Sequence, residues 1–247
     1  MVNEKEHLLV IGGVAAGMKA AAKARRESPA MKITVVTDEP YISYAGCGMP
    51  YFIGDIIKDS KKLILREPIY FKNMHNIDVL TRHQATAIDT KSRQVKVRDL
   101  EKNKDISFHY DKLIIATGAQ PIVPPLTGIS LGNIFTLRTV KDALKIRACV
   151  DSGMVKNAVI VGGGLIGLEM AENLILRGIK VTVVELLDQI LPPLDKGMAL
   201  LVQKHVMEKG VEVVASDGVK SFEGNSSGAV TTVITGKRQL PADMVIL

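Results

Sequence analysis

The sequence of 247 residues lacks the features that mark several classes of protein. It has only two cysteines, Cys47 and Cys149, which excludes a secreted scaffold held together by disulfides. No apolar run approaches the roughly 18–20 residues of a membrane-spanning helix, so no membrane partner is expected. The charged residues 1–7 lead into an apolar run that ends at Gly12 and is too short for a secretory signal. A reducing, cytoplasmic setting is therefore expected.

Aromatic residues are also scarce, at 4% of the sequence, and the basic residues behind the net charge of +6 are scattered. Domains that bind nucleic acid usually cluster their basic residues, so no nucleic-acid partner is expected. The positive balance suits small molecules that carry phosphate equally well. No metal site is predicted, because the histidines lack metal-ligand spacing; they are His7, His75, His83, His109 and His205. With 47% hydrophobic and 23% charged residues, the chain has an ordinary globular composition.

What the sequence does contain is an internal repeat. Residues 8–17 (LLVIGGVAAG) match residues 158–167 (AVIVGGGLIG). Each copy begins as an apolar run of strand length, passes through a glycine turn and continues as a helical stretch. A second apolar strand follows each helix, at 32–37 and 180–185. Two strand–turn–helix–strand segments predict an α/β fold with two Rossmann-like, three-layer units that bind dinucleotides.

The rest of the sequence predicts further elements. Apolar and polar residues alternate over 86–100 around a turn-like stretch at 90–93, which indicates a β-hairpin. The prolines of 121–125 indicate a linker. Periodicity predicts helices at 144–150 (with Cys149 as a packing residue) and 196–209, and strands at 113–118, 211–215, 229–235 and 242–247. Because the sequence ends inside the last strand, we expect it to be cut short.

The second glycine turn carries the complete pattern of a dinucleotide site. Gly162, Gly164 and Gly167 let the backbone approach a pyrophosphate, and the helix that starts at Leu165 and Ile166 supplies free N–H groups. Glu185 closes the next strand and can accept hydrogen bonds from both ribose hydroxyls, whereas it repels a 2′-phosphate. NADH is therefore expected rather than NADPH. The alternative is a tight turn in an α/β unit that binds no dinucleotide.

The first glycine turn is less regular. Gly12 and Gly17 match the outer glycines, but Val14 stands in the place of the middle one and Ala15 follows it. The acid is displaced as well, because Thr37 matches Glu185 and Asp38 comes one residue later. This copy alone is a weaker indication of a nucleotide site.

Cys47 follows the first unit, between Gly46 and Gly48. Small neighbours leave its sulfur accessible, and a thiol near a helix start and a flavin is held as the thiolate, the form that attacks sulfur. The alternative is that Cys47 is simply a small buried residue.

Together these features resemble the flavin-dependent pyridine nucleotide–disulfide oxidoreductases. The resemblance rests on two dinucleotide units, on Cys47 and on residues 116–118 (ATG), and residues 43–51 (SYAGCGMPY) are closest to the single-cysteine branch. That branch holds coenzyme A-disulfide and coenzyme A-persulfide reductases, NADH peroxidases and NADH oxidases. Residues 162–170 (GGGLIGLEM) and 188–195 (DQILPPLD) add to the match, which covers essentially the whole sequence.

Two positions then distinguish between the members of this family that the sequence resembles. Phe52 stands where dithiol members of the family have a second cysteine, which excludes a dithiol mechanism. Ala15 stands where NADH peroxidases and oxidases keep a histidine beside the active cysteine. The loop with Val14 and Ala15 is similar to that of the coenzyme A-disulfide and persulfide reductases, in which departure from the middle glycine is usual.

The resemblance also implies roles for individual residues. Contacts with FAD are expected from Gly12, Val14, Ala15, Gly17, Asp38, Ala85, Thr117 and Gly118, and contacts with NADH from Gly162, Gly164, Leu165, Ile166, Gly167 and Glu185. Ser43 is expected near the thiolate of Cys47; the alternative is a turn hydroxyl that bonds its own backbone. Lys19, Lys23 and Arg26 are expected to bind the phosphates of coenzyme A; the alternative is a solvated helix face.

The implied protein is an FAD-dependent enzyme that uses NADH to reduce coenzyme A disulfide or persulfide through Cys47. The implied domains are an FAD-binding domain (1–120), a linker with a connecting helix (121–155) and an NAD(H)-binding domain (156–247). A dimerisation domain is expected beyond the end of this sequence, and a homodimer in the full-length protein. One alternative is an NADH oxidase or peroxidase that cycles Cys47 through sulfenic acid. Another is a dinucleotide-binding module without turnover.

Overall fold

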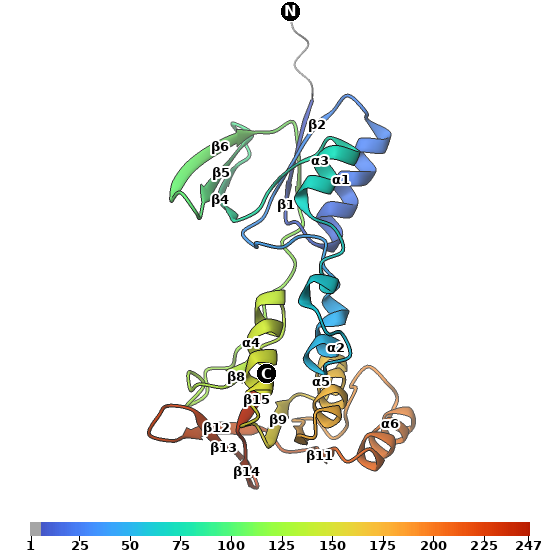
Figure 1. Cartoon of the computed structure of the whole chain (residues 1–247), viewed down its shortest axis with the longest axis vertical. Coiled ribbons are helices and arrows are strands. Elements are labelled where there is room, and N and C mark those ends of the chain that lie inside the picture. Colours follow the sequence, from blue (N-terminus) through green and yellow to red (C-terminus); the bar gives the residue numbers. More distant parts are fainter. Residues whose placement is uncertain (1–5) are drawn as a thin grey trace, which may run out of the picture. The chain divides into compact units, whose positions relative to one another are not determined.

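A computed structural model describes residues 6–247, and these fall into two units (Figure 1). Unit 1 contains the described residues up to Ala45 together with Lys61–Ala119, and unit 2 contains Gly46–Ser60 and Gln120–Leu247. This division differs from the one expected from the sequence, which assigned 46–60 to the first domain and set 121–155 apart. The difference arises because the segment after Ala45 packs on two helices of unit 2, one of which lies within 121–155.

Unit 1 is built on a parallel sheet in the order β3-β2-β1-β7. An antiparallel sheet, β4-β5-β6, lies in the chain between β3 and β7. The elements of this unit are β1 (His7–Ile11), α1 (Ala15–Glu27), β2 (Lys32–Val36), α3 (Pro68–His75), β3 (Asp78–Leu80), β4 (His83–Asp89), β5 (Gln94–Asp99), β6 (Lys104–His109) and β7 (Lys112–Ile115). A short 3-10 helix, Ser60–Leu63, spans the chain boundary between the units.

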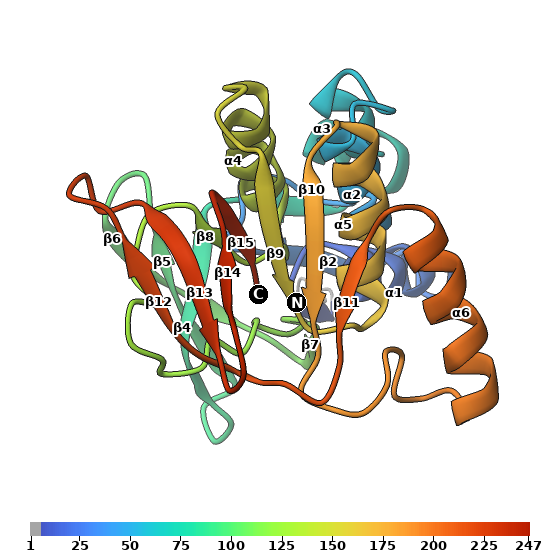
Figure 2. The ribbon, with the colours of Figure 1, turned by 90° about the horizontal axis from the view of Figure 1, so that it is seen from below.

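Unit 2 repeats this plan with one more strand. Its parallel sheet has the order β11-β10-β9-β15-β8, and its antiparallel sheet is β12-β13-β14 (Figure 2). The elements are α2 (Met49–Ile53), β8 (Ile134–Phe135), α4 (Val140–Asp151), β9 (Asn157–Val161), α5 (Leu165–Leu176), β10 (Lys180–Val184), α6 (Lys196–Glu208), β11 (Glu212–Val214), β12 (Val219–Gly224), β13 (Val230–Thr235), β14 (Gln239–Pro241) and β15 (Met244–Ile246). A 3-10 helix at Gly46–Gly48 precedes α2.

The apolar runs of the sequence repeat form the centres of both parallel sheets. The strands β1 and β9 are flanked on both sides, and their apolar residues are buried, as expected for parallel strands covered on both faces. In each unit the chain runs from the central strand to one side, and later returns on the other side as β7 or β15. Such a reversal leaves a crevice at the carboxyl ends of the strands, which is where open α/β sheets bind ligands. The predicted α/β fold with two dinucleotide-type units is confirmed.

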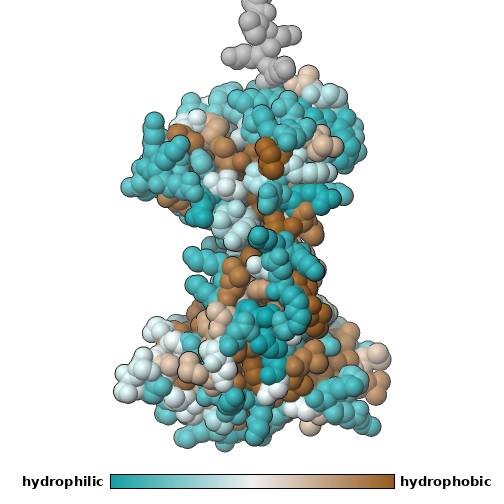
Figure 3. Space-filling view, viewed as in Figure 1, coloured by the Kyte–Doolittle hydropathy of each residue, from teal (hydrophilic) through white to brown (hydrophobic). Residues whose placement is uncertain are grey.

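On the face drawn in Figure 3, both units mix hydrophobic and hydrophilic residues. Within residues 6–247, the structure has no helix that combines the length and the apolar character needed to span a bilayer. The same residues contain no group of three or more histidine, cysteine or acidic side chains arranged to hold a metal ion.

Candidate functional site

The first glycine turn holds α1 close to the end of the parallel sheet. Gly12 has a φ of +110°, and a Cβ at this position would lie 2.1 Å from the carbonyl oxygen of Ala116. A Cβ at Gly17 would lie 1.8 Å from the carbonyl oxygen of Gly12. The outer glycines are therefore required by close backbone approaches, one between β1 and the end of β7 and one between α1 and the turn. The middle position is held by Val14, which is half-buried.

The second turn has the same geometry and is more open. Gly162 has a φ of +107°, and a Cβ at Gly167 would lie 2.2 Å from the carbonyl oxygen of Gly162. Around Gly164, in contrast, nothing lies within 4 Å of an added Cβ. The space beside Gly164 is of the kind that a pyrophosphate needs in order to approach the backbone.

The helices that follow both turns begin without a side-chain cap. Neither Val14, which precedes α1, nor Gly164, which precedes α5, caps the helix with its side chain, and the first turns contain no acid. By comparison, Thr139 caps α4 and Asp195 caps α6. Unbonded N–H groups at the positive end of a helix are a binding site for phosphate. Both turns therefore fit the pyrophosphate of a dinucleotide.

The acid at the end of β10 is tied to the second turn. Glu185 is buried, and its Oε2 accepts a hydrogen bond of 2.8 Å from the N–H of Gly163, while its Oε1 accepts one of 2.9 Å from Leu187. In unit 1 the equivalent position is held by Thr37, which is also buried, and the exposed Asp38 follows it. The backbone register supports this equivalence, because each residue donates its N–H to the third strand, Thr37 to Leu80 and Glu185 to Val214.

The other residues predicted to contact FAD come from the ends of neighbouring elements in unit 1. Thr117 and Gly118 follow β7 after one intervening residue, at the same sheet edge as Gly12. Ala85 lies on β4 next to an irregularity in the pairing with β5. Ser43 has a φ of +47° and donates its N–H to the carbonyl oxygen of Gly13 over 3.0 Å. Its predicted place beside Cys47 stays a prediction, since Ser43 and Cys47 belong to different units.

The basic residues predicted to bind coenzyme A lie on α1. Lys19, Lys23 and Arg26 are exposed, and Lys23 forms an ion pair with Glu27. Exposed pairs of this kind contribute little to stability, so breaking the pair with Glu27 to bind another anion would cost Lys23 little free energy. Arg25 differs from these residues, because its guanidinium donates to the backbone carbonyls of His75, Pro29, Met31 and Asn76 and so has a structural role.

Cys47 is exposed, so the interpretation of this residue as buried packing is wrong. It lies in the 3-10 helix before α2 and lines a cavity of about 320 Å³ in unit 2. Leu165 and Ile166, in the first turn of α5, line the same cavity and are 75% and 59% exposed. The structure thus brings the predicted redox cysteine and two predicted NADH-binding residues to one cavity. Cys149, on α4, is half-buried, and burial raises the pKa of its thiol.

Sequence reasoning missed the polar part of this cavity. Glu169 lines it from α5, and its Oε2 is buried without a hydrogen-bond partner. The nearby charge of Glu169, and a hydrogen bond from the Tyr51 phenol to its carboxylate, raise the pKa of Tyr51. Leu137 and Arg138, from the segment before α4, complete this side. Glu169 lies on the same face of α5 as Leu165 because residues four apart on a helix are neighbours, which is the signal that could have identified it.

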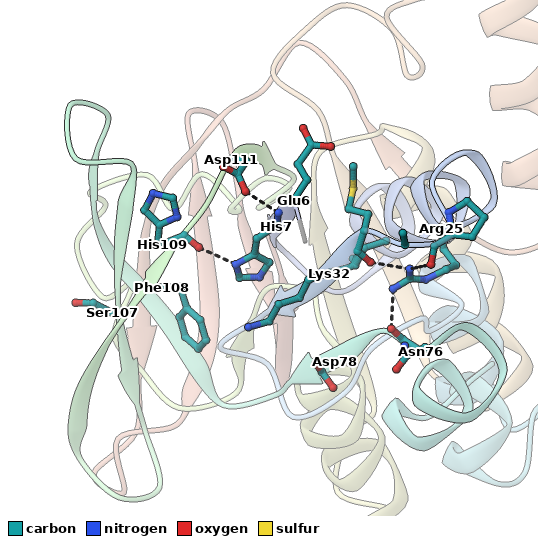
Figure 4. A pocket seen from close by; sticks show the side chains of 14 residues that line it. Glu6, His7, Arg25, Lys32, Asn76, Asp78, Ser107, Phe108, His109 and Asp111 are labelled. Atoms are coloured by element: carbon teal, nitrogen blue, oxygen red, sulfur yellow. Dashed lines mark hydrogen bonds between the residues drawn. The ribbon is translucent and has the colours of Figure 1, made fainter. Parts of the chain in front are cut away.

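A larger cavity, of about 1060 Å³, lies in unit 1 and contains none of the predicted site residues (Figure 4). His7, at the start of β1, lies in its wall. The His7 Nδ1 lies 2.7 Å from the carbonyl oxygen of His109, and its Nε2 lies 2.9 Å from the Thr34 hydroxyl (Figure 4 draws the first of these bonds). Burial lowers the pKa of His7, and the nearby charge of Lys32 acts in the same direction.

His7 is therefore expected to make unit 1 less stable in mild acid. The unfolded chain takes up a proton near the ordinary histidine pKa of about 6.5, whereas the folded chain does so only at lower pH. Stability is complete above that value and falls as the pH drops below it. The midpoint of urea unfolding should be lower at about pH 5.5 than at about pH 7.5, and His7→Gln should reduce this difference. His205→Gln, an exposed position on α6, is the control, and an equal effect of both variants would contradict the assignment.

Comparison with known proteins places these features in one family. Residues 6–247 match the family described as pyridine nucleotide-disulphide oxidoreductase. An NADH oxidase of Methanocaldococcus jannaschii is 36% identical over 240 residues, which are 97% of this chain and 53% of that protein. An NAD-dependent persulfide reductase from A. fulgidus has a TM-score of 0.92 at 40% identity, over 97% of this chain and 44% of that one.

The structure of reduced CoADR-RHD from Bacillus anthracis is similar as well, with a TM-score of 0.94 at 37% identity, over 98% of this chain and 43% of that one. The chain thus spans about half the length of the curated relatives it matches. Since the match with the family extends over all the described residues, the chain belongs to the pyridine nucleotide-disulphide oxidoreductase family.

Proposed function

We propose that this chain provides the FAD site, the NADH site and the redox cysteine of an enzyme that reduces the sulfur–sulfur bond of coenzyme A disulfide or persulfide. Its family uses FAD and NAD(P)H. The observation that carries the proposal is the cavity of unit 2, where an exposed cysteine meets the first turn of a helix that follows a dinucleotide-type glycine turn. A cysteine that serves only for packing is usually buried and does not line a cavity of this kind.

The two cofactors are assigned to different units of the chain. FAD is assigned to the edge of unit 1 that carries Gly12, Gly17, Asp38, Thr117 and Gly118, and NADH to the edge of unit 2 that carries Gly162, Gly164 and Glu185. When bound, the two cofactors supply the hydride and the electrons of the reaction. The contribution of the chain is to hold them and to present the sulfur of Cys47.

The chemical step of this chain is thiol–disulfide exchange at Cys47. The thiolate of Cys47 attacks one sulfur of coenzyme A disulfide, the bond between the two substrate sulfurs breaks, and a mixed disulfide of Cys47 and coenzyme A forms. The first coenzyme A leaves as a thiolate and takes a proton from water. Two electrons and a second proton then release the other coenzyme A as its thiol and restore the thiolate of Cys47. With coenzyme A persulfide, the outer sulfur leaves in the corresponding way.

An NADH oxidase or peroxidase is the second candidate, and the NADH oxidase of M. jannaschii favours it. In that case the thiolate of Cys47 attacks one oxygen of hydrogen peroxide, the O–O bond breaks, hydroxide leaves and sulfenic acid forms. Two electrons and a proton then return the thiolate and release water. Ala15 disfavours this candidate, because the methyl group at the start of α1 offers no proton donor or acceptor for oxygen chemistry. A dinucleotide-binding module without turnover is the third candidate.

The test is NADH consumption by the purified protein with four acceptors: coenzyme A disulfide, a coenzyme A persulfide, hydrogen peroxide and oxygen. Flavin absorbance is measured first. Faster turnover with peroxide or oxygen than with either coenzyme A substrate would overturn the proposal in favour of the oxidase or peroxidase. A colourless protein that binds NADH but not added FAD would favour the module.

Glu185 provides a separate check of the NADH site. Removing its carboxylate in Glu185→Ala should raise the KM for NADH by about tenfold or more, since hydrogen bonds to a charged group contribute roughly 1.5–3 kcal/mol. Asp188→Ala is the matched control, because Asp188 is an exposed acid on the same segment that pairs with Lys196. An unchanged KM in Glu185→Ala would remove Glu185 from this role.

A further inference from the structure

The segment that carries Cys47 is attached to the rest of unit 2 through the C-terminal end of α2. Arg147, on α4, donates from Nη1 to the carbonyl oxygen of Phe52, and Arg177, at the end of α5, donates from Nη1 to that of Ile53 over 3.0 Å. The last carbonyls of a helix lack partners within the helix, and the carbonyl oxygen of Phe52 also accepts from the N–H of Asp55 over 3.2 Å. With only five residues, α2 is too short to be stable on its own, so the partners at its ends determine whether it forms.

The two arginines are joined by one carboxylate. Asp151 accepts from Arg147 Nε at 2.7 Å with Oδ2, and from Arg177 Nη2 at 2.6 Å with Oδ1. Arg147 also forms an ion pair with Asp55, just after α2, and lies 5.3 Å from the centre of the Phe52 ring. Hydrogen bonds from Lys58 and Arg147 lower the pKa of Asp55 to about 2. The arginine side chains are only 16% and 20% exposed, which separates this cluster from ordinary surface ion pairs.

Two more contacts fix the register of α2 on α5. A Cβ at Gly54 would lie 2.2 Å from Oδ1 of the fully buried Asn173, so the two helices approach as closely as a glycine allows. Nearer to Cys47, the Tyr51 phenol lies close enough to Glu169, in the wall of the cavity, for the charge of that carboxylate to raise the pKa of Tyr51. Movement of α2 along α5 would break both contacts.

From this geometry we propose that Arg147 and Arg177, joined by Asp151, are positioning residues that hold Cys47 at its cavity. The importance of that position rests on the function proposed for Cys47, whereas the attachment of α2 does not. Neither arginine lines the cavity, and both act through the backbone of α2. Methionine at these positions keeps the apolar stem and removes every donor.

The test compares the full chain with Arg147→Met, Arg177→Met and the double variant. Lys145→Met, an exposed position on α4, is the control. The first readout is hydrogen exchange at Gly54, Ile56 and Ile57, whose amides bond to carbonyls of α2. Exchange there should accelerate about tenfold or more in the double variant, with β9 and β10 unchanged. The second is the titration of Tyr51 by NMR of labelled tyrosine, assigned with Tyr51→Phe. Its pKa should move back toward the ordinary value of about 10.

A purely structural clasp would alter exchange without moving the Tyr51 titration, and that result would overturn the positioning role. Unchanged exchange at these three amides would overturn the attachment itself. If the double variant does not fold, Arg177→Met alone carries both readouts, and Arg147→Lys should restore part of the wild-type behaviour. The rate at which Cys47 forms a mixed disulfide with coenzyme A disulfide is measured in parallel. If the wild-type chain forms none, the proposed function fails while the exchange and titration results still decide the attachment.

Discussion

Replacement of Cys47 by serine is expected to abolish the reduction of coenzyme A disulfide by NADH, with turnover lower by about three orders of magnitude or more. A serine hydroxyl is not ionised near neutral pH and cannot form a disulfide with the substrate. The cavity should remain intact, since serine is close to cysteine in size and the position is exposed. Hydride transfer from NADH to the flavin should therefore persist, and it can be followed as bleaching of the flavin absorbance in the absence of oxygen.

Cys149→Ser is the matched control for this experiment, because Cys149 is the second free cysteine and is not among the residues that line the cavity of Cys47. It should keep disulfide turnover near the wild-type level. A Cys47→Ser protein that still reduces coenzyme A disulfide would show that the electrons reach the substrate by a route without this sulfur. Loss of flavin bleaching in the same variant would instead indicate that the substitution disturbs a cofactor site.

The sequence predicted those parts of the fold that depend on local rules. A glycine turn between an apolar strand and a helix requires close backbone contacts that no other residue permits, and Gly12 and Gly167 make such contacts. The hairpin at 86–100 forms as β4 and β5 because its alternation matches the two faces of a strand. Similarly, the helix predicted at 196–209 is α6, which ends at Glu208 just before the predicted end.

What the sequence could not supply depends on contacts between distant segments. Residues 46–60 join unit 2 because Arg147 and Arg177 bond to α2 from about 95 and 124 positions further along the chain, and no local pattern encodes such a pairing. The strands β3 and β8, which the sequence did not predict, have only three and two residues, so their existence is decided by the neighbouring strand more than by propensity. Helix spacing places Glu169 on the same face of α5 as Leu165, but the cavity that it lines is formed by the packing of α5 against α2.

Two glycines of the second turn, Gly167 and Gly164, are expected to respond differently to replacement by alanine: the first substitution should reduce stability and the second should weaken NADH binding. In Gly167→Ala the methyl group would lie 2.2 Å from the carbonyl oxygen of Gly162, and relieving this overlap would require the backbone to shift, which costs free energy. We expect unit 2 to lose about 3 kcal/mol of stability, as overpacked sites commonly do. In Gly164→Ala the methyl group enters open space and the φ of −79° suits any residue, so stability should change by no more than about 0.5 kcal/mol.

The same Gly164→Ala variant should nevertheless bind NADH more weakly, with KM raised by about tenfold or more, because the added methyl group occupies the space through which a pyrophosphate reaches the N–H groups of α5. Urea unfolding and NADH titration of both variants measure the two effects independently. Gly132→Ala, where the φ is not left-handed, an added Cβ makes only ordinary contacts (3.4 Å to the carbonyl oxygen of Gly228) and no ligand is assigned, controls for a general effect of removing a glycine. If Gly164→Ala kept the wild-type KM, the pyrophosphate would have to lie elsewhere, and the open space in this turn would be a consequence of packing alone.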